Sequence, residues 1–150
     1  GEGTMTAPNS VAVQKCIEDA LRNSTINSNE IDTINGHLTA TIKDSLEIFN
    51  WSKALKLSKS NFPYINSLKS MVGHCLSASG SIESVATILQ VYHGFIFPSI
   101  NCEDLHPEID TLVEREKIPQ QLIQKEINIA VKASFGFGDV NACVVFKKFR

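Results

Sequence analysis

The sequence contains no apolar run that approaches the roughly 20 residues needed to cross a bilayer. Its first residues, 1–5, have neither the basic start nor the apolar centre of a signal peptide. The cysteines form none of the closely spaced pairs of a metal site; they are Cys16, Cys75, Cys102 and Cys143. Reduced, unpaired thiols are typical of cytoplasmic proteins. We therefore expect no membrane span, no metal site and a cytoplasmic location.

The sequence also lacks an excess of charge of either sign. Lysine and arginine number 14 and the acidic residues 16, so the formal net charge is −2. Binding to nucleic acid phosphates needs a basic surface, and the one basic run, residues 147–150, is short. We expect no nucleic-acid partner. A hydrophobic fraction of 43% over 150 residues indicates one globular domain with a buried core, residues 1–150.

Helical and extended patterns alternate along the chain. Helical spacing predicts one helix over residues 10–22 and a second that begins at Asp44, which caps it. A third is predicted over residues 81–93, with Gly94 at its end. On this last helix, apolar residues line one side: Ile82, Val85, Ala86, Leu89 and Tyr92. Short apolar runs predict strands at residues 31–34, 63–68, 127–133 and 142–146, the last two antiparallel because their connection is short. This order predicts an α/β unit in which helices cover a mixed sheet.

Two histidines follow predicted strands and are flanked by glycine, serine or threonine. His37 lies in the stretch INGHLTAT, and His74 ends the stretch KSMVGH, which begins with Lys69. Open α/β sheets place their chemistry at the ends of strands, so one fold can bring both histidines to the same edge. Neutral imidazoles can each donate an N–H to an oxygen on which negative charge develops, and Lys69 can stabilise an anion. His93 and His106 fit structural positions better.

A glycine-aromatic segment, SFGFG at residues 134–138, joins the last two predicted strands. Composition alone favours a plain hairpin turn. The alternative is a mobile turn whose backbone N–H groups face an oxyanion while Phe137 gates a hydrophobic tunnel. Nucleotide binding is disfavoured, because these glycines lie outside a strand-loop-helix context.

Three blocks of the chain resemble, in order, motifs of the β-ketoacyl-(acyl-carrier-protein) synthases, the condensing enzymes of fatty acid and polyketide synthesis. The blocks are residues 35–41 with Asp44 and Glu47 (first-histidine motif), residues 69–74 with Gly80 and Glu83 (second-histidine motif), and residues 134–138 with Asn141 and Ala142 (C-terminal gating loop). Residues 6–8 (TAP) and 97–101 (FPSIN) also fit the family. The resemblance covers nearly the whole chain.

The resemblance implies that residues 1–150 are the C-terminal half of a thiolase-like fold and part of a longer protein. In this family the N-terminal half supplies a cysteine nucleophile that takes the acyl chain. The implied activity of the full-length protein is that of an acyltransferase, which joins malonyl-carrier to the bound acyl chain with loss of CO₂. None of the four cysteines lies in the nucleophile motif. We therefore expect this chain alone not to condense acyl groups.

The resemblance also implies partners. These are acyl carrier protein, whose phosphopantetheine arm carries the substrate, the N-terminal half of the synthase, and a second copy in a homodimer. No covalently bound cofactor is implied. An isolated half would expose the apolar face meant for its twin, so we expect it to self-associate.

Carried over motif by motif, the resemblance implies roles for individual residues. His37 and His74 would promote decarboxylation and stabilise the thioester enolate. Lys69 and Glu83 would organise the polar network behind them, together with Asp44. Substrate contacts would come from Thr39, Thr41, Phe135, Gly136 and Gly138, the two threonines meeting the phosphopantetheine arm. The Phe137 N–H would face the acyl oxyanion, and its ring would gate the tunnel.

The chain departs from the family pattern beside these motifs. Leu38 stands where glycine is usual, Ala133 replaces an asparagine, and Asp139-Val140 replaces Gly-Thr. Asp139 would put a carboxylate at the mouth of the site, where it either tunes the loop or faces water. These changes bear on acyl specificity and not on the class of reaction.

Two other functions stay open. One is a non-catalytic partner subunit, similar to a chain-length factor, that pairs with a true synthase. Retention of both histidines argues against it. A cysteine at the upstream nucleophile position would support the enzyme, and another residue there would support the partner subunit. The other is a carrier-protein binding module, which would need a hydrophobic or basic docking patch that the sequence does not locate.

Overall fold

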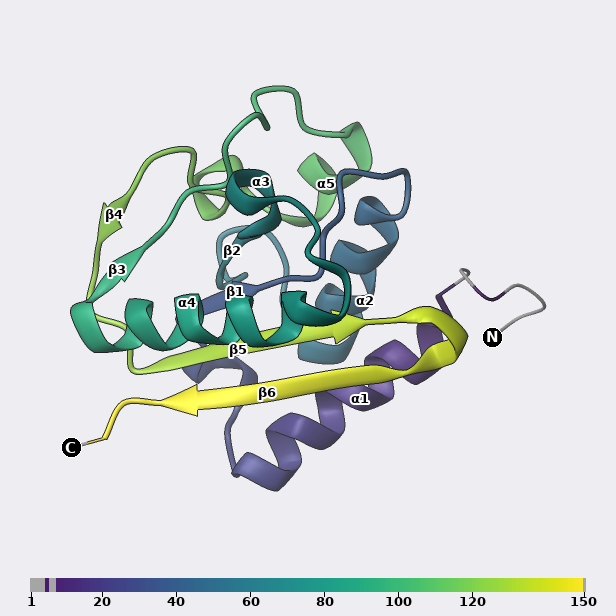
Figure 1. The fold of residues 1–150 in the computed structure, drawn as a ribbon, viewed down its shortest axis with the longest axis horizontal. Helices are drawn as coiled ribbons and strands as arrows, with labels where there is room; N and C mark the ends of the chain where they lie inside the picture. The colour runs from purple at the N-terminus through teal and green to yellow at the C-terminus, as the bar shows by residue number, and fades with distance from the viewer. Residues whose placement is uncertain (1–4, 6–7, 150) are drawn as a thin grey trace.

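The computed structural model describes Met5 and residues 8–149 (Figure 1). Residues 6–7, from one segment that fits the resemblance, and Arg150 of the basic run lie outside the described residues. The helices are α1 (Ser10–Ser24), α2 (Asp44–Leu55), α3 (Lys69–Val72), α4 (Ser79–His93) and α5 (Pro107–Leu112), with 3-10 turns η1 (Ser28–Glu30), η2 (Leu76–Ala78), η3 (Arg115–Lys117) and η4 (Phe137–Asp139). The strands are β1 (Thr33–Asn35), β2 (Tyr64–Asn66), β3 (Phe95–Ile96), β4 (Ile123–Gln124), β5 (Ile129–Phe135) and β6 (Asn141–Lys147). None of the described helices is both long and apolar enough to cross a membrane.

One sheet has the strand order β2-β1-β5-β6. β1 runs parallel to both β2 and β5, whereas β5 and β6 pair antiparallel across the glycine-aromatic turn. The predicted mixed sheet and its antiparallel pair are therefore confirmed. Since β1, β2 and β5 run in the same direction, the segments that follow them leave the sheet at one edge. Those segments carry His37, His74 and Phe137.

Helices cover both faces of this sheet (Figure 1). Successive strand residues point to opposite faces, so β5 contributes to two clusters. Val131 and Ala133 join the main core with α1 and α2, where Trp51 is fully buried. Ala130 joins a smaller cluster with Val91 of α4. The predicted helix over residues 10–22 is α1, and its side-chain cap is Asn9, whose Oδ1 accepts the N–H of Ala12.

Helix α4 packs its polar side against the sheet and leaves its apolar side exposed. The buried polar residues are Ser79, Glu83, Thr87 and Gln90, and the exposed apolar residues are Ile82, Val85, Ile88, Leu89 and Tyr92. The reason lies in the sheet, which presents amide and ammonium groups to the helix. Asn35 Nδ2 donates to Thr87 Oγ1 at 3.0 Å, and Asn66 Nδ2 donates to Gln90 Oε1 at 3.2 Å. Gly94 ends the helix in the left-handed conformation, as predicted.

The exposed apolar side of α4 predicts self-association of the isolated chain, because a contiguous apolar surface on a soluble domain favours contact with another protein surface. We expect light scattering to give a mass above the 16.5 kDa of one chain. The double variant Val85→Glu/Leu89→Lys should shift the chain toward monomer, since it places charges on that side in a favourable i,i+4 order. Val11→Glu, at an exposed apolar position of α1, is the matched control and should leave the mass unchanged. A wild-type chain that is monomeric at all concentrations would contradict this prediction.

Candidate active site

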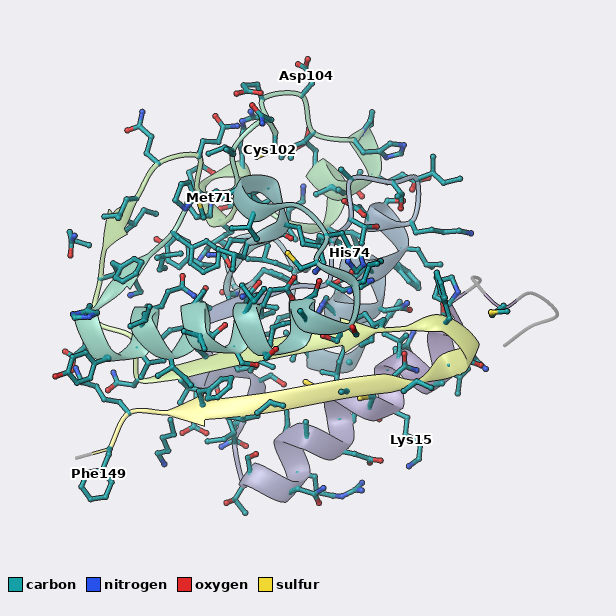
Figure 2. The ribbon with its side chains drawn as sticks, viewed as in Figure 1. Lys15, Met71, His74, Cys102, Asp104 and Phe149 are labelled. Carbon is teal, nitrogen blue, oxygen red and sulfur yellow. The ribbon has the colours of Figure 1, made fainter. Side chains whose placement is uncertain are left out.

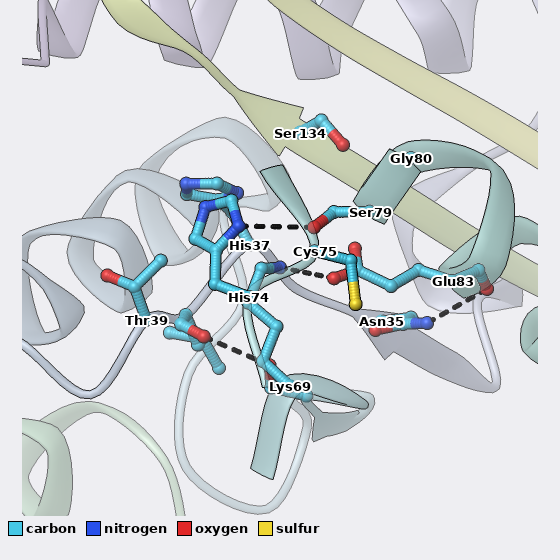
Figure 3. Close-up of polar contacts among 12 residues, drawn as sticks. Asn35, His37, Thr39, Lys69, His74, Cys75, Ser79, Gly80, Glu83 and Ser134 are labelled. Atoms are coloured by element: carbon cyan, nitrogen blue, oxygen red, sulfur yellow. Dashed lines mark hydrogen bonds and ion pairs between the residues drawn. The ribbon is translucent and has the colours of Figure 1, made fainter. Parts of the chain in front are cut away.

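The structure brings His37 and His74 together. Their ring centroids lie 5.5 Å apart with the ring planes at 86° (Figure 3). His37 lies in the loop that follows β1, two residues after the strand ends. His74 lies in the loop that follows β2 and the short helix α3. The parallel pairing of β1 with β2 is what carries both segments to the same edge. Two side chains 37 residues apart in the sequence thus form one unit.

The buried carboxylate of Glu47 fixes the backbone at His37. Its Oε1 accepts the His37 N–H at 2.7 Å, and its Oε2 accepts the Leu38 N–H at 2.8 Å. Trp51 Nε1 also donates to Oε1, at 3.3 Å. Burial raises the pKa of Glu47 to about 7, against the three N–H donors, which favour the ionised form. Glu47 is part of the first-histidine motif, but the resemblance implied no role for it.

His74 is oriented by the turn η2 and by the first residue of α4. Its Nδ1 accepts the Leu76 N–H at 3.0 Å and lies 3.1 Å from the Ser79 hydroxyl (Figure 3). A ring nitrogen that accepts a backbone N–H carries no proton, so the ring proton resides on Nε2. Figure 2 shows His74 near the end of α4 where the helix begins. The arrangement leaves Nε2–H as the free donor of this ring.

His37 is held in its neutral form. Burial, followed by the charges of Lys69 and Lys132, lowers the pKa of His37 from 6.5 to about 4. His74 acts in the same direction, and Glu83 opposes it. The Nδ1 atom of His37 is buried and has no hydrogen-bond partner among the described residues. Near neutral pH this ring is an imidazole and not an imidazolium.

Behind the two rings lies a buried cluster of Lys69, Glu83 and Lys132. Glu83 Oε1 is 2.5 Å from Lys69 Nζ, and Glu83 Oε2 is 2.6 Å from Lys132 Nζ. The side chains of the three residues are at most 5% exposed. The resemblance implied that Lys69 and Glu83 belong to one polar network behind the histidines, and it did not include Lys132. A lysine inside the apolar run of residues 127–133 was the available signal, because such a charge is buried only when it has partners.

One cavity of about 520 Å³ gathers most of the expected site residues. Its lining includes both histidines and the expected substrate contacts Thr39, Thr41, Phe135, Gly136 and Phe137. Lys69 and Glu83 lie behind this wall, and Gly138 lies outside the lining. Among the described residues, no group of three or more His, Cys, Asp or Glu side chains is arranged to hold a metal.

The loop after His37 is held by Asp44, but not as predicted. Asp44 is the first residue of α2, and Lys43 occupies the cap position without a side-chain cap bond. The Asp44 carboxylate instead accepts the backbone N–H groups of Thr39 at 3.0 Å and Ala40 at 3.1 Å. The prediction that Asp44 caps this helix is therefore wrong, because the loop takes its carboxylate. These bonds give Asp44 a structural role in the loop after His37, and none of them reaches Lys69 or Glu83.

Two residues that depart from the family pattern, Leu38 and Asp139, make specific contacts in the structure. Leu38 donates its N–H to Glu47, its carbonyl accepts the Ser67 hydroxyl at 3.0 Å, and its side chain lines a second cavity of about 310 Å³. Asp139, at the end of the turn and at φ 62°, accepts the Asn9 N–H at 3.3 Å through its carboxylate. Asn9 also caps α1. Asp139 thus ties the turn to the start of α1, which favours the loop-tuning interpretation over a carboxylate that only faces water.

Comparison with known proteins gives a consistent set of matches. A family model described as "Beta-ketoacyl synthase, C-terminal domain" matches residues 1–103. The chain is 36% identical over 148 residues to "3-oxoacyl-[acyl-carrier-protein] synthase I, chloroplastic" of Arabidopsis thaliana, covering 97% of this chain and 30% of that protein. It superposes on "The ishigamide ketosynthase/chain length factor" with a TM-score of 0.89 and 27% identity, covering 99% of this chain and 36% of that one. A ketosynthase described in complex with a type II PKS acyl-carrier protein matches with a TM-score of 0.84 and 29% identity, again covering 99% of this chain and 36% of that one. The chain thus spans about a third of the length of these proteins.

Gly36 is expected to tolerate no side chain. A Cβ atom there would meet Glu47 Oε1 at 2.9 Å, and that carboxylate is held by three donors. We expect Gly36→Ala to lower the free energy of unfolding by about 1–3 kcal/mol, as overpacking of a buried site does. Denaturant unfolding measures it. Gly80→Ala is the matched control, since its Cβ would meet only Ser134 Oγ at 3.8 Å, and an unchanged midpoint for Gly36→Ala would contradict the tight fit.

The lowered pKa of His37 predicts its titration. In a pH series followed by the Cε1–H signal in NMR, assigned with a His37→Gln variant, we expect a midpoint near 4. Because the folded-state pKa lies below the unfolded value of about 6.5, this residue stabilises the fold above that value. The stabilisation is lost as the pH falls toward 4. A midpoint at 6.5 or above would show that neither burial nor the buried cations lower the pKa of this ring.

Proposed function

Because the chain belongs to the β-ketoacyl synthase family, whose C-terminal domain it matches, we propose that it supplies the histidine side of a decarboxylative condensation site. The ketosynthase structures it superposes on confirm the thiolase-like fold expected from the sequence. Its relatives are 3-oxoacyl-[acyl-carrier-protein] synthases, which are condensing enzymes. The observation that carries the proposal is the pair of imidazole rings 5.5 Å apart on the wall of one cavity.

The proposed reaction begins with malonyl thioester. The electron pair of the bond to the carboxylate moves toward the thioester carbonyl, CO₂ leaves, and negative charge develops on the carbonyl oxygen. A donor that meets this oxygen as the charge arrives lowers the barrier, and one such donor contributes about 3–4 kcal/mol. The enolate carbon then attacks an acyl thioester on a cysteine elsewhere in the full-length protein, and the cysteine thiolate leaves.

Both histidines suit the role of donor. His74 has its free proton on Nε2, because Nδ1 accepts the Leu76 N–H. His37 is neutral, and its buried Nδ1 has no partner among the described residues. A buried N–H without a partner is rarer than a buried acceptor without one, so the His37 proton also belongs on Nε2. Each ring then offers one N–H to the cavity.

The other expected contacts follow from the lining of the same cavity. Thr39 and Thr41, whose hydroxyls lie 3.3 Å apart, would meet the phosphopantetheine arm of the carrier. Phe137 is 69% exposed at the tip of the turn, where its ring would gate the entrance and its N–H would face the acyl oxyanion. Gly138 has a φ of 67°, so it would shape this turn without lining the cavity.

The proposed partners are those that the resemblance implies. One ketosynthase that the chain superposes on is described in complex with an acyl-carrier protein, which supports a carrier protein as partner. The exposed apolar side of α4 would meet the N-terminal half of the same synthase, and a homodimer stays a prediction. The cytoplasmic location also stays a prediction, since the Arabidopsis relative is named as chloroplastic.

The proposal is tested in the full-length protein by CO₂ release from malonyl-carrier. We expect His37→Ala and His74→Ala each to lower the rate about 100- to 1,000-fold, the usual effect of removing one oxyanion donor. His106→Asn is the matched control, because it replaces a histidine outside the site and keeps a side chain able to cap α5. The isolated chain should release no ketoacyl product. Near wild-type rates in either alanine variant would refute the assigned roles.

A further inference from the structure

Lys132 occupies an unusual place for a lysine. It lies within β5, between its partners Asn35 of β1 and Val144 of β6, and its side chain is 3% exposed. Burying an ammonium costs several kcal/mol unless its N–H groups find partners. Here Nζ lies at 2.6 Å from Glu83 Oε2, donates to Ser134 Oγ at 2.9 Å, and also donates to the Ala133 carbonyl. All three ammonium protons are therefore accounted for.

The cluster holds more positive charge than a structural ion pair needs. Glu83 contributes one negative charge, and its two oxygens are shared between two ammonium groups. One lysine would be enough to tie α4 to the rest of the fold and neutralise this carboxylate. The second leaves a surplus of one positive charge in a buried place. That surplus lies behind His37, whose pKa both lysines lower.

We propose that Lys132 is a positioning residue of the site: its ammonium, held by Glu83 and Ser134, keeps a surplus positive charge behind the cavity that His37 lines. This inference rests on the proposed function. During decarboxylation the negative charge moves from the departing carboxylate to the thioester oxygen beside the histidines. A fixed cation behind them stabilises the second arrangement without having to reorganise. Through Glu83, Lys132 also ties β5 to α4 just before the turn that follows the strand.

Several charged or titratable groups surround Lys132. Glu83 of α4 contacts it, Lys69 of α3 shares that carboxylate, and Glu47 of α2 acts on it from the other layer. The charge of Lys132 also acts to lower the pKa of Cys143 of β6 and that of His37. Removing the Lys132 charge leaves Lys69 and Glu83 as a neutral pair. The field on His37 then becomes less positive, and protonation of its ring becomes easier.

The test compares Lys132→Met, of similar length and neutral, with Lys148→Met, which removes a half-exposed lysine paired with Glu126. In the full-length protein we expect the NMR midpoint of His37 to move up by about 1 pH in Lys132→Met and to stay in Lys148→Met. The kcat of malonyl decarboxylation at pH 7 should fall about tenfold in Lys132→Met only, with KM little changed. An unmoved midpoint together with a kcat equal to that of Lys148→Met would overturn the proposal.

A second variant keeps the test decisive where Lys132→Met does not fold. Lys132→Ala leaves a hole lined by the same oxygen atoms, and n-propylammonium replaces the missing part of the side chain. Recovery of the low His37 midpoint with this amine supports the proposal, and no recovery overturns it. If the wild-type protein releases no CO₂, the proposed function is refuted. The His37 midpoint is measured without turnover, so it still tests the proposal about Lys132 in that case.

Discussion

The structure depends on one buried carboxylate, Glu83, held between two ammonium groups. A buried ion pair contributes little net stability, because the cost of removing charges from water offsets their attraction. Removing one member is far more costly, since it leaves a buried charge without its partner. The cluster therefore joins α4, α3 and β5 in one arrangement. Figure 3 shows its Lys69 and Glu83 members beside His37 and His74.

This cluster belongs to a polar layer that runs between α4 and the sheet. Thr87 and Gln90 continue it along the helix, and Asn35 and Asn66 continue it across β1 and β2. Each bond in the layer has a specific partner, so it fixes the position of α4 along its axis more sharply than apolar contacts would. The same layer explains why the apolar residues of α4 point away from the sheet.

The fold could be predicted from sequence further than the site could. Periodicity located α1, α2, α4 and the four strands of the main sheet, but not the short α3 and α5. Parallel strands explain why His37, His74 and Phe137 meet at one edge. Periodicity could not tell which side of α4 is buried, because that depends on the amides and the lysine of a sheet formed by distant residues. Lys132 and Glu83 are 49 residues apart, and Glu47 acts through backbone N–H groups, so no local pattern identifies the partner in either contact. The lysine within the apolar run of residues 127–133 indicates only that Lys132 needs a partner. The prediction for Asp44 was wrong because its carboxylate can accept N–H groups either from the start of α2 or from the preceding loop. In the structure it accepts those of Thr39 and Ala40 in the loop.

The two histidines also differ in how they depend on their surroundings. His37 is neutral because of burial and nearby charge within this chain, whereas His74 is exposed and is oriented through Leu76 and Ser79. Leu76 lines the cavity and is itself 77% exposed, just before the apolar side of α4 begins. A protein surface that covers α4 would therefore also close over His74 and lower the dielectric around the cavity. Hydrogen bonds to a developing oxyanion strengthen in such a medium. The polar layer beneath α4 therefore holds in place both the helix and Ser79, which contacts His74.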